Sequence, residues 1–243
     1  MSRASLTQRL YGAYGVAAFA VLSSALLVLA TALPGLRRRR RAAGLFARLF
    51  FRAAGIELIV EGLERLPGTP CVLVANHASY IDGVVAIAAL PPDFAFVIKR
   101  EMNRVPLASW LLRRLGSAFV ERFDRHKGGS DTRRVWRLAA TGQSLVFFPE
   151  GTFEAERRIA PFLNGAFATA ARSGLPVVAA AIHGTREVLP SGSARLRRRP
   201  IRFQVLGVVE SENARQASRE RIAEAVGEPL HREDAPGSSR VGV

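Results

Sequence analysis

The longest uninterrupted run of apolar positions lies near the start of the chain, from Tyr11 to Leu33, and holds 23 residues without a charge. A helix rises about 1.5 Å per residue, so this run can cross a hydrocarbon layer roughly 30 Å thick. Five arginines, Arg37–Arg41, follow it directly, whereas only Arg3 and Arg9 precede it. We therefore predict a membrane-anchoring helix in the inner membrane, with the rest of the chain facing the cytoplasm.

A secretory signal peptide is the alternative interpretation of this segment, because residues 30–32 resemble a cleavage site. The apolar run is longer than the usual signal-peptide core of about 7–15 residues, and the arginines behind it oppose translocation. An uncleaved anchor is therefore the prediction.

The next segment, Leu36–Ala54, interleaves arginines with apolar residues at helical spacing, namely Leu45, Phe46, Leu49 and Phe50. This pattern fits an amphipathic helix that lies on the membrane surface, and it fits equally a helix that packs its apolar stripe on the domain.

From Ile56 onward, short apolar runs alternate with helical periodicity. The predicted strands are Ile56–Val60, Cys71–Ala75, Phe94–Ile98, Ser144–Phe148, Val177–Ile182 and Ile201–Val209, and the predicted helices are Asp82–Leu90, Leu107–Leu115, Asp131–Ala140, Ala166–Arg172 and Ala214–Val226. The alternation predicts an α/β fold, with a mixed, largely buried sheet flanked by helices. We expect an anchor and basic amphipathic segment over residues 1–54, one catalytic domain over 55–227 and a mobile tail over 228–243.

Charge narrows the choice of partner. The chain carries 35 Lys and Arg against 20 Asp and Glu, a formal charge of +15. Such a protein is drawn to anionic surfaces, and nucleic acid, anionic lipid headgroups and phosphate-bearing cofactors all qualify. The uncharged run favours lipid. The single cysteine, Cys71, excludes an intramolecular disulfide.

Polar residues follow the predicted strand Cys71–Ala75 in the segment N-H-A-S-Y-I-D, residues 76–82. On one continuous helix His77 and Asp82 would point about 140° apart, since each residue advances the helix by about 100°. They can meet only if the chain turns between them and the helix begins near Ser79 or later. Asp82 would then bind one ring nitrogen of His77 and leave the other to take a proton. A helix cap with a structural histidine is the alternative.

A second polar segment, F-F-P-E-G-T at residues 147–152, lies at the end of the predicted strand Ser144–Phe148. It offers the Glu150 carboxylate, the Thr152 hydroxyl and, at Gly151, a backbone that a ligand can approach closely. The N–H groups of Gly151 and Thr152 could bind an anion or a hydroxyl. A simple turn is the alternative.

Together, in this order and about 70 residues apart, these segments resemble the catalytic and acceptor-binding blocks of the glycerolipid acyltransferase family. The best-known members of that family are the lysophosphatidic acid (1-acylglycerol-3-phosphate) acyltransferases. Two further blocks match, one through Lys99, Arg100, Glu101, Met102, Pro106, Gly116 and Arg122, and one through residues 176–185. The resemblance covers roughly residues 56–209.

The resemblance implies phospholipid biosynthesis: an acyl group passes from acyl-CoA or acyl-carrier protein to a lysophospholipid hydroxyl, most commonly that of 1-acylglycerol-3-phosphate. It makes His77 the general base and Asp82 the residue that orients it. Its acceptor-binding residues are Glu150, Gly151 and Thr152, with Lys99, Arg100, Arg122 and Arg157 as candidates for the headgroup. It implies no cofactor and no metal, with membrane lipids and the acyl donor as partners.

The chain departs from the family pattern at Phe153, where many members have an arginine, and at Ala179 and Ser109, which replace a proline and a glycine. Phe153 leaves the acceptor headgroup open, because an Arg–phosphate pair is lost. An acceptor without a phosphate monoester is therefore the alternative.

Three other classes of function compete. A nucleic-acid-binding protein would explain the arginines, including Arg195 and Arg197–Arg199, but no nucleic-acid motif is present. A serine hydrolase could use Ser79 beside His77 and Asp82, yet there is no G-x-S-x-G segment. A metal site lacks a second histidine at ligand spacing.

Overall fold

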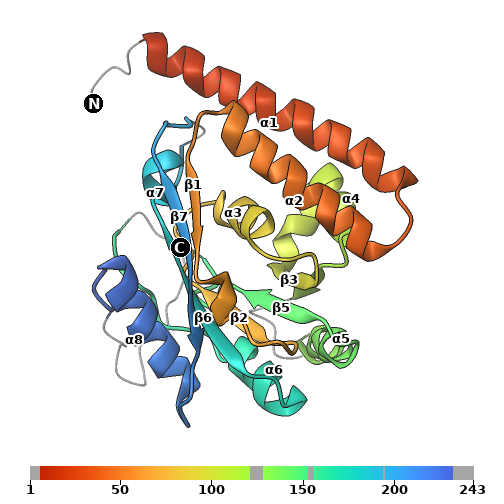
Figure 1. Ribbon diagram of the computed structural model, residues 1–243, viewed down its shortest axis with the longest axis vertical. Coiled ribbons are helices and arrows are strands. Elements are labelled where there is room, and N and C mark those ends of the chain that lie inside the picture. Colours follow the sequence, from red (N-terminus) through yellow and green to blue (C-terminus); the bar gives the residue numbers. More distant parts are fainter. Residues whose placement is uncertain (1–5, 121–127, 153–155, 194, 232–243) are drawn as a thin grey trace.

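The computed structural model describes residues 6–120, 128–152, 156–193 and 195–231, and within them seven strands form one sheet (Figure 1). The order is β1-β7-β6-β2-β5-β3-β4. β6 and β7 are antiparallel, and every other neighbouring pair is parallel. The strands are β1 (Leu58–Glu61), β2 (Val72–Ala75), β3 (Phe94–Lys99), β4 (Ala118–Val120), β5 (Ser144–Phe147), β6 (Val177–His183) and β7 (Ile201–Val208). The predicted mixed sheet is confirmed.

The helices of the described residues are α1 (Leu6–Ala32), α2 (Leu36–Ala53), α3 (Asp82–Ala89), α4 (Pro106–Arg114), α5 (Gly128–Ala140), α6 (Gly165–Ser173), α7 (Thr185–Val188) and α8 (Ala214–Val226), with short 3₁₀ helices η1 (Leu63–Arg65) and η2 (Arg100–Arg104). Each predicted strand and helix is present. The anchor helix begins five residues before the predicted Tyr11, and every other end differs by at most three residues. The sequence prediction missed β4 and α7, which are too short to show a period.

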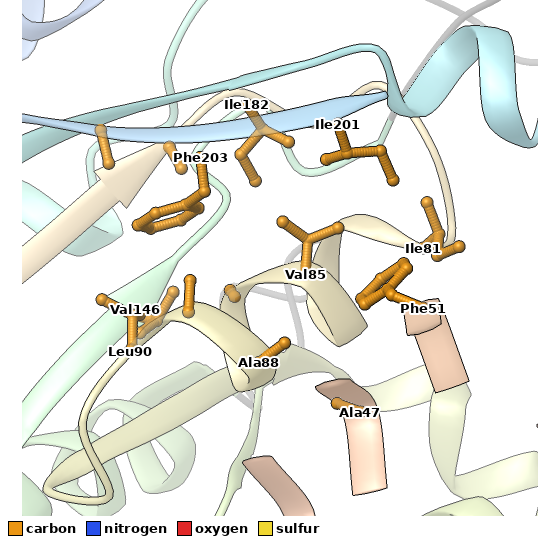
Figure 2. Packing of buried hydrophobic residues seen from close by; sticks show 14 of the residues in the cluster. Ala47, Phe51, Ile81, Val85, Ala88, Leu90, Val146, Ile182, Ile201 and Phe203 are labelled. Atoms are coloured by element: carbon orange, nitrogen blue, oxygen red, sulfur yellow. The ribbon is translucent and has the colours of Figure 1, made fainter. Parts of the chain in front are cut away.

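Alternation along the strands divides the core into two layers. Leu73 of β2 belongs to the same buried cluster as Phe51 of α2 and Val85 of α3, on one face of the sheet. Figure 2 shows Phe51 and Val85 in this cluster. Val72 and Val74 of the same strand face the opposite way, toward the layer of α5, α6 and α8. Both faces are therefore covered, which is why the strands read as continuous apolar runs rather than alternating ones.

The predicted anchor forms α1, which lies lengthwise beside α2 (Figure 1). Near one end the Tyr11 hydroxyl donates to the Ala54 carbonyl over 2.8 Å, and near the other Arg114 donates to the Ala30 carbonyl over 3.0 Å. Within the described residues α1 is the one helix long and apolar enough to cross a membrane, with a mean hydropathy of 2.2 in its most apolar window, of which 17% is buried. Most of its apolar surface is uncovered.

The basic segment behind it, α2, has two kinds of side chain in its apolar stripe. Phe50 is buried in the core and Phe46 packs against a smaller cluster of Leu26, Ala43 and Leu115, whereas Leu45 and Leu49 are exposed. The helix therefore packs part of its apolar stripe on the domain, and its place on a membrane surface stays a prediction. Arg40, from the arginine run, is buried and donates to the Leu115 carbonyl over 2.8 Å, so this arginine stabilises packing.

Candidate active site

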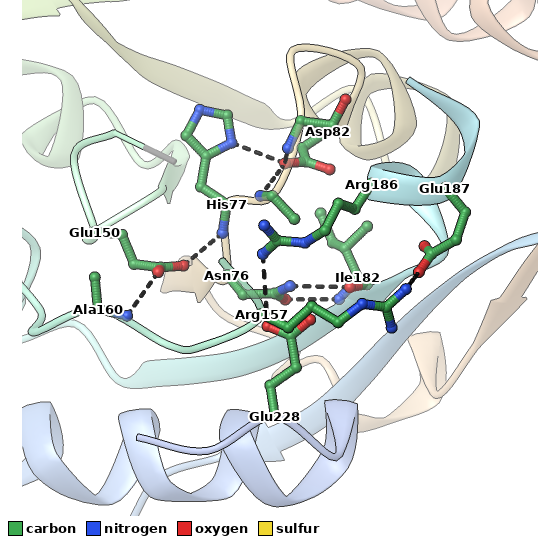
Figure 3. Close-up of polar contacts among 12 residues, drawn as sticks. Asn76, His77, Asp82, Glu150, Arg157, Ala160, Ile182, Arg186, Glu187 and Glu228 are labelled. Carbon is green, nitrogen blue, oxygen red and sulfur yellow. Dashed lines mark hydrogen bonds and ion pairs between the residues drawn. The ribbon is translucent and has the colours of Figure 1, made fainter. Parts of the chain in front are cut away.

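The carboxyl ends of three neighbouring strands, β6, β2 and β5, carry the polar residues of the site (Figure 3). Directly after β2, the Asn76 side chain donates to the Ile182 carbonyl over 2.9 Å and accepts from the Ile182 N–H over 2.8 Å. This double contact closes the end of β2 against β6. His77, the next residue, therefore leaves the sheet from a fixed point.

His77 and Asp82 meet as the sequence predicted. His77 Nδ1 lies 2.8 Å from Asp82 Oδ2, and the same oxygen accepts from the N–H groups of Ala78 (2.7 Å) and Ser79 (2.8 Å). Asp82 is fully buried and is the first residue of α3. The chain thus turns between the two residues, and the helix begins after Ser79.

The contact with Asp82 settles the chemistry of the histidine ring. A carboxylate bound to Nδ1 favours the tautomer with the proton on Nδ1, so Nε2 is the nitrogen suited to accept a proton. The Phe148 ring stacks on the imidazole, with 4.7 Å between centroids and 26° between planes. Both contacts hold the orientation of the ring, and the Asp82 contact favours the tautomer that a general base requires.

Glu150, which follows β5, also reaches the histidine. Glu150 Oε1 accepts from the His77 N–H over 2.7 Å, and Oε2 accepts from the Ala160 N–H over 2.9 Å. Burial raises the pKa of Glu150 to about 7, the two N–H groups lower this pKa, and the charges of Asp82 and Glu228 raise it further. The second polar segment is thus joined directly to the first.

The other residues of the second segment lie beside this contact. Gly151 has a left-handed φ of 79°, and its N–H donates to the Phe148 carbonyl over 3.1 Å. That N–H is engaged within the turn. Of the two N–H groups predicted to bind an anion, the other belongs to Thr152, which is exposed. The N–H groups of residues 77–79 are likewise used by carboxylates.

The predicted headgroup cations are already paired or lie elsewhere. Lys99, at the end of β3, is 3.4 Å from Glu101, and Arg157 forms an ion pair with Glu187. Arg100 is exposed at the start of η2. Arg122, and with it Phe153, lies outside the described residues.

An ion pair between Arg186 and Glu228 also lies near the site, and the sequence did not predict it. Arg186 of α7 lies 3.6 Å from Glu228, which follows the C-cap Gly227 of α8, and both side chains are largely buried. Burial raises the pKa of Glu228, and the charges of Arg186 and Arg157 lower it. Because these residues are far apart along the chain, no local pattern could reveal them. Glu228 also shows that hydrogen-bonded structure continues into the predicted tail, where the His231 N–H donates to the Ile159 carbonyl.

The structure argues against a serine hydrolase. Ser79 is buried, and its hydroxyl donates to the Leu189 carbonyl over 2.6 Å. The hydroxyl proton is therefore not directed at His77, as a nucleophilic serine would require. In the part of the chain that is described, no group of three or more His, Cys, Asp or Glu side chains is placed to hold a metal ion.

A sequence model of the family described as Acyltransferase matches residues 57–183, more than half of the 243 residues. The chain belongs to this family. A lyso-ornithine lipid O-acyltransferase of Pseudomonas aeruginosa is 32% identical over 202 residues, covering 80% of this chain and 74% of that protein. A chloroplastic 1-acyl-sn-glycerol-3-phosphate acyltransferase of Brassica napus is 36% identical over 136 residues, covering 55% of this chain.

The family fold also matches a solved structure. The 1-acyl-sn-glycerophosphate acyltransferase PlsC of Thermotoga maritima superposes with a TM-score of 0.77, over 91% of this chain and 95% of that one, at 22% sequence identity. The match extends the shared fold well beyond the blocks seen in the sequence. The chain spans about two fifths of the length of the chloroplast relatives it matches.

Burial of Glu150 predicts a pH dependence of stability. Its pKa is raised above the ordinary value of 4.5 to about 7, so the folded state binds the proton of this carboxyl more tightly than the unfolded state does. This contribution to the free energy of unfolding is fully present below pH about 4.5 and is lost as the pH rises through about 7. Relative to Glu150→Gln, the wild-type free energy of unfolding should fall over this range by roughly 3 kcal/mol, from 1.36 kcal/mol per pKa unit. Denaturant titrations at several pH values measure this, with Glu64→Gln, an exposed glutamate, as the control. A wild-type chain that gains stability over this range would contradict the result.

Proposed function

We propose that this chain moves a fatty acyl group from acyl-CoA or acyl-carrier protein to the hydroxyl of a lysophospholipid, with 1-acylglycerol-3-phosphate as the principal acceptor, in phospholipid biosynthesis. The observation that carries the proposal is the contact of His77 Nδ1 with Asp82 Oδ2, beside the Glu150 segment, in a member of the Acyltransferase family. The Brassica relative supports the acceptor.

The reaction is a single displacement. His77 Nε2 takes the proton of the acceptor hydroxyl while its oxygen attacks the thioester carbonyl. The carbon–sulfur bond then breaks, and the leaving thiolate takes the proton from His77. The Asp82 carboxylate stabilises the imidazolium that forms between these steps, and it keeps the ring oriented.

The described cations favour a second candidate acceptor, one that lacks a phosphate monoester. Arg157, Arg186 and Lys99 each pair with a glutamate, so an anionic headgroup must compete with a carboxylate at every one of them. A zwitterionic headgroup could bind both members of such a pair. The Pseudomonas relative, which acts on a lyso-ornithine lipid, aligns with most of this chain, and Phe153 replaces the usual arginine.

Contacts of α1 support attachment to one leaflet of the cytoplasmic membrane. Hydrogen bonds from Tyr11 and Arg114 hold both ends of the helix against the domain. A spanning helix would have to break at least one of them. We therefore propose that the exposed apolar side of α1, with Leu45 and Leu49 of α2, enters the leaflet that faces the cytoplasm.

The turnover rate of His77→Ala should be at least about 10²-fold lower than that of the wild type, because general-base catalysis typically accelerates a reaction by about 10²–10⁴-fold. Ser79→Ala should keep most of its activity, since the Ser79 hydroxyl binds the Leu189 carbonyl. Transfer of labelled acyl groups to lysophosphatidic acid, by purified full-length chain in lipid, measures both. Near-normal transfer by His77→Ala would refute the mechanism, and an inactive but folded Ser79→Ala would favour a hydrolase.

Arg157→Gln should raise the KM for 1-acylglycerol-3-phosphate roughly tenfold or more, because a charge-assisted contact contributes about 1.5–3 kcal/mol. The KM for acyl-CoA should stay the same, and Arg215→Gln, an exposed arginine of α8, serves as the control. The same assay with lyso-ornithine lipid separates the two acceptors. Turnover of that lipid without turnover of 1-acylglycerol-3-phosphate would reject the first acceptor and retain acyl transfer.

If α1 lies in one leaflet, both of its ends face the cytoplasm. A membrane-impermeant maleimide added to inside-out vesicles should label Leu6→Cys and Ala32→Cys, and neither should be labelled in right-side-out vesicles. The native Cys71 is buried and gives little background. Labelling of the two ends from opposite sides would show that the helix spans the membrane instead.

A further inference from the structure

Both carboxylate oxygens of Glu150 are occupied by the protein's own backbone. Oε1 accepts from the His77 N–H over 2.7 Å, Oε2 accepts from the Ala160 N–H over 2.9 Å, and the residue is 9% exposed. Figure 3 shows the side chain lying between these two N–H groups. If Glu150 turned toward an acceptor hydroxyl, two N–H groups would lose a charge-assisted partner. The contacts therefore favour a role inside the protein.

The Ala160 side of this bridge is firmly held. The Ile159 N–H donates to the Pro229 carbonyl over 3.0 Å. Arg219 of α8, itself buried, donates to the carbonyls of Ile159 and Ala160 over 3.1 Å each. The Ala160 N–H is thus part of a segment that is hydrogen-bonded to α8. Glu150 links the main chain of His77 to this segment.

The His77 side of the bridge complements the Asp82 contact. Three successive N–H groups turn toward carboxylates, that of His77 toward Glu150 and those of Ala78 and Ser79 toward Asp82. Asp82 holds the ring and the start of the turn, whereas Glu150 holds the main chain from which the side chain extends. A base displaced by about 1 Å can lose about 10² in rate.

We propose that Glu150 is a positioning residue, which holds the main chain of His77 against the Ile159–Ala160 segment and does not bind the acceptor. The inference rests on the proposed acyl transfer for its kinetic consequence. Its structural part, the hold on residue 77, stands on the contacts alone.

Kinetics of a graded series separate this role from acceptor binding. Glu150→Gln keeps one acceptor oxygen and should lower kcat about tenfold, and Glu150→Ala removes both and should lower kcat about 100-fold. The KM values for acceptor and acyl-CoA should stay within about twofold. Glu64→Gln, on the exposed η1, is the matched carboxylate control. A tenfold rise in acceptor KM with an unchanged kcat would show that Glu150 binds the acceptor and would overturn the proposal.

Amide hydrogen exchange tests the hold on His77 without relying on turnover. In the full-length chain the His77 and Ala160 N–H groups should exchange at least about tenfold faster in Glu150→Ala than in the wild type, with no change in Glu64→Gln. Unchanged exchange at His77 in a folded Glu150→Ala would overturn the positioning role. Faster exchange, together with a wild-type chain that acylates neither lysolipid, would support the hold and refute the proposed function.

Discussion

Asp82 Oδ2 accepts three hydrogen bonds at once, from the His77 ring and from the N–H groups of Ala78 and Ser79. A fully buried carboxylate is costly unless such donors compensate it, and the N-terminus of α3 adds a favourable dipole. The turn of residues 77–81, the start of the helix and the orientation of the imidazole all bring donors to this one oxygen. The turn that supplies donors to the Asp82 carboxylate also orients the His77 ring.

The order of the strands converts this local arrangement into a site. β2 lies between β6 and β5, so Asn76 ties the first polar segment to β6, and Glu150 ties it to the segment after β5. Residues about 70 positions apart in the chain thus become neighbours at the carboxyl ends of adjacent parallel strands. On one face of the sheet, α3 packs against α2 through Val85 and Phe51, so the helix that begins at Asp82 and the apolar helices share one layer of the core.

Much of this could be predicted from the sequence, because the decisive signals are local. The five-residue spacing of His77 and Asp82 required a turn before the helix, and α3 begins at Asp82. Long-range pairing left no such signal: Arg186 meets Glu228, and Glu150 meets the N–H groups of His77 and Ala160, only after the chain has folded. The arginine run shows only its charge in the sequence, although Arg40 is buried and donates to the Leu115 carbonyl.

The central claim is that Asp82 sets the tautomer of His77, and nitrogen-15 NMR of the histidine side chains measures this directly. The chain has four histidines, so the His77 signals can be assigned with His77→Gln. In the neutral ring we expect the proton on Nδ1 and none on Nε2, and a loss of this preference in Asp82→Asn. A proton on Nε2 in the resting wild-type enzyme, or a spectrum that Asp82→Asn leaves unchanged, would contradict it.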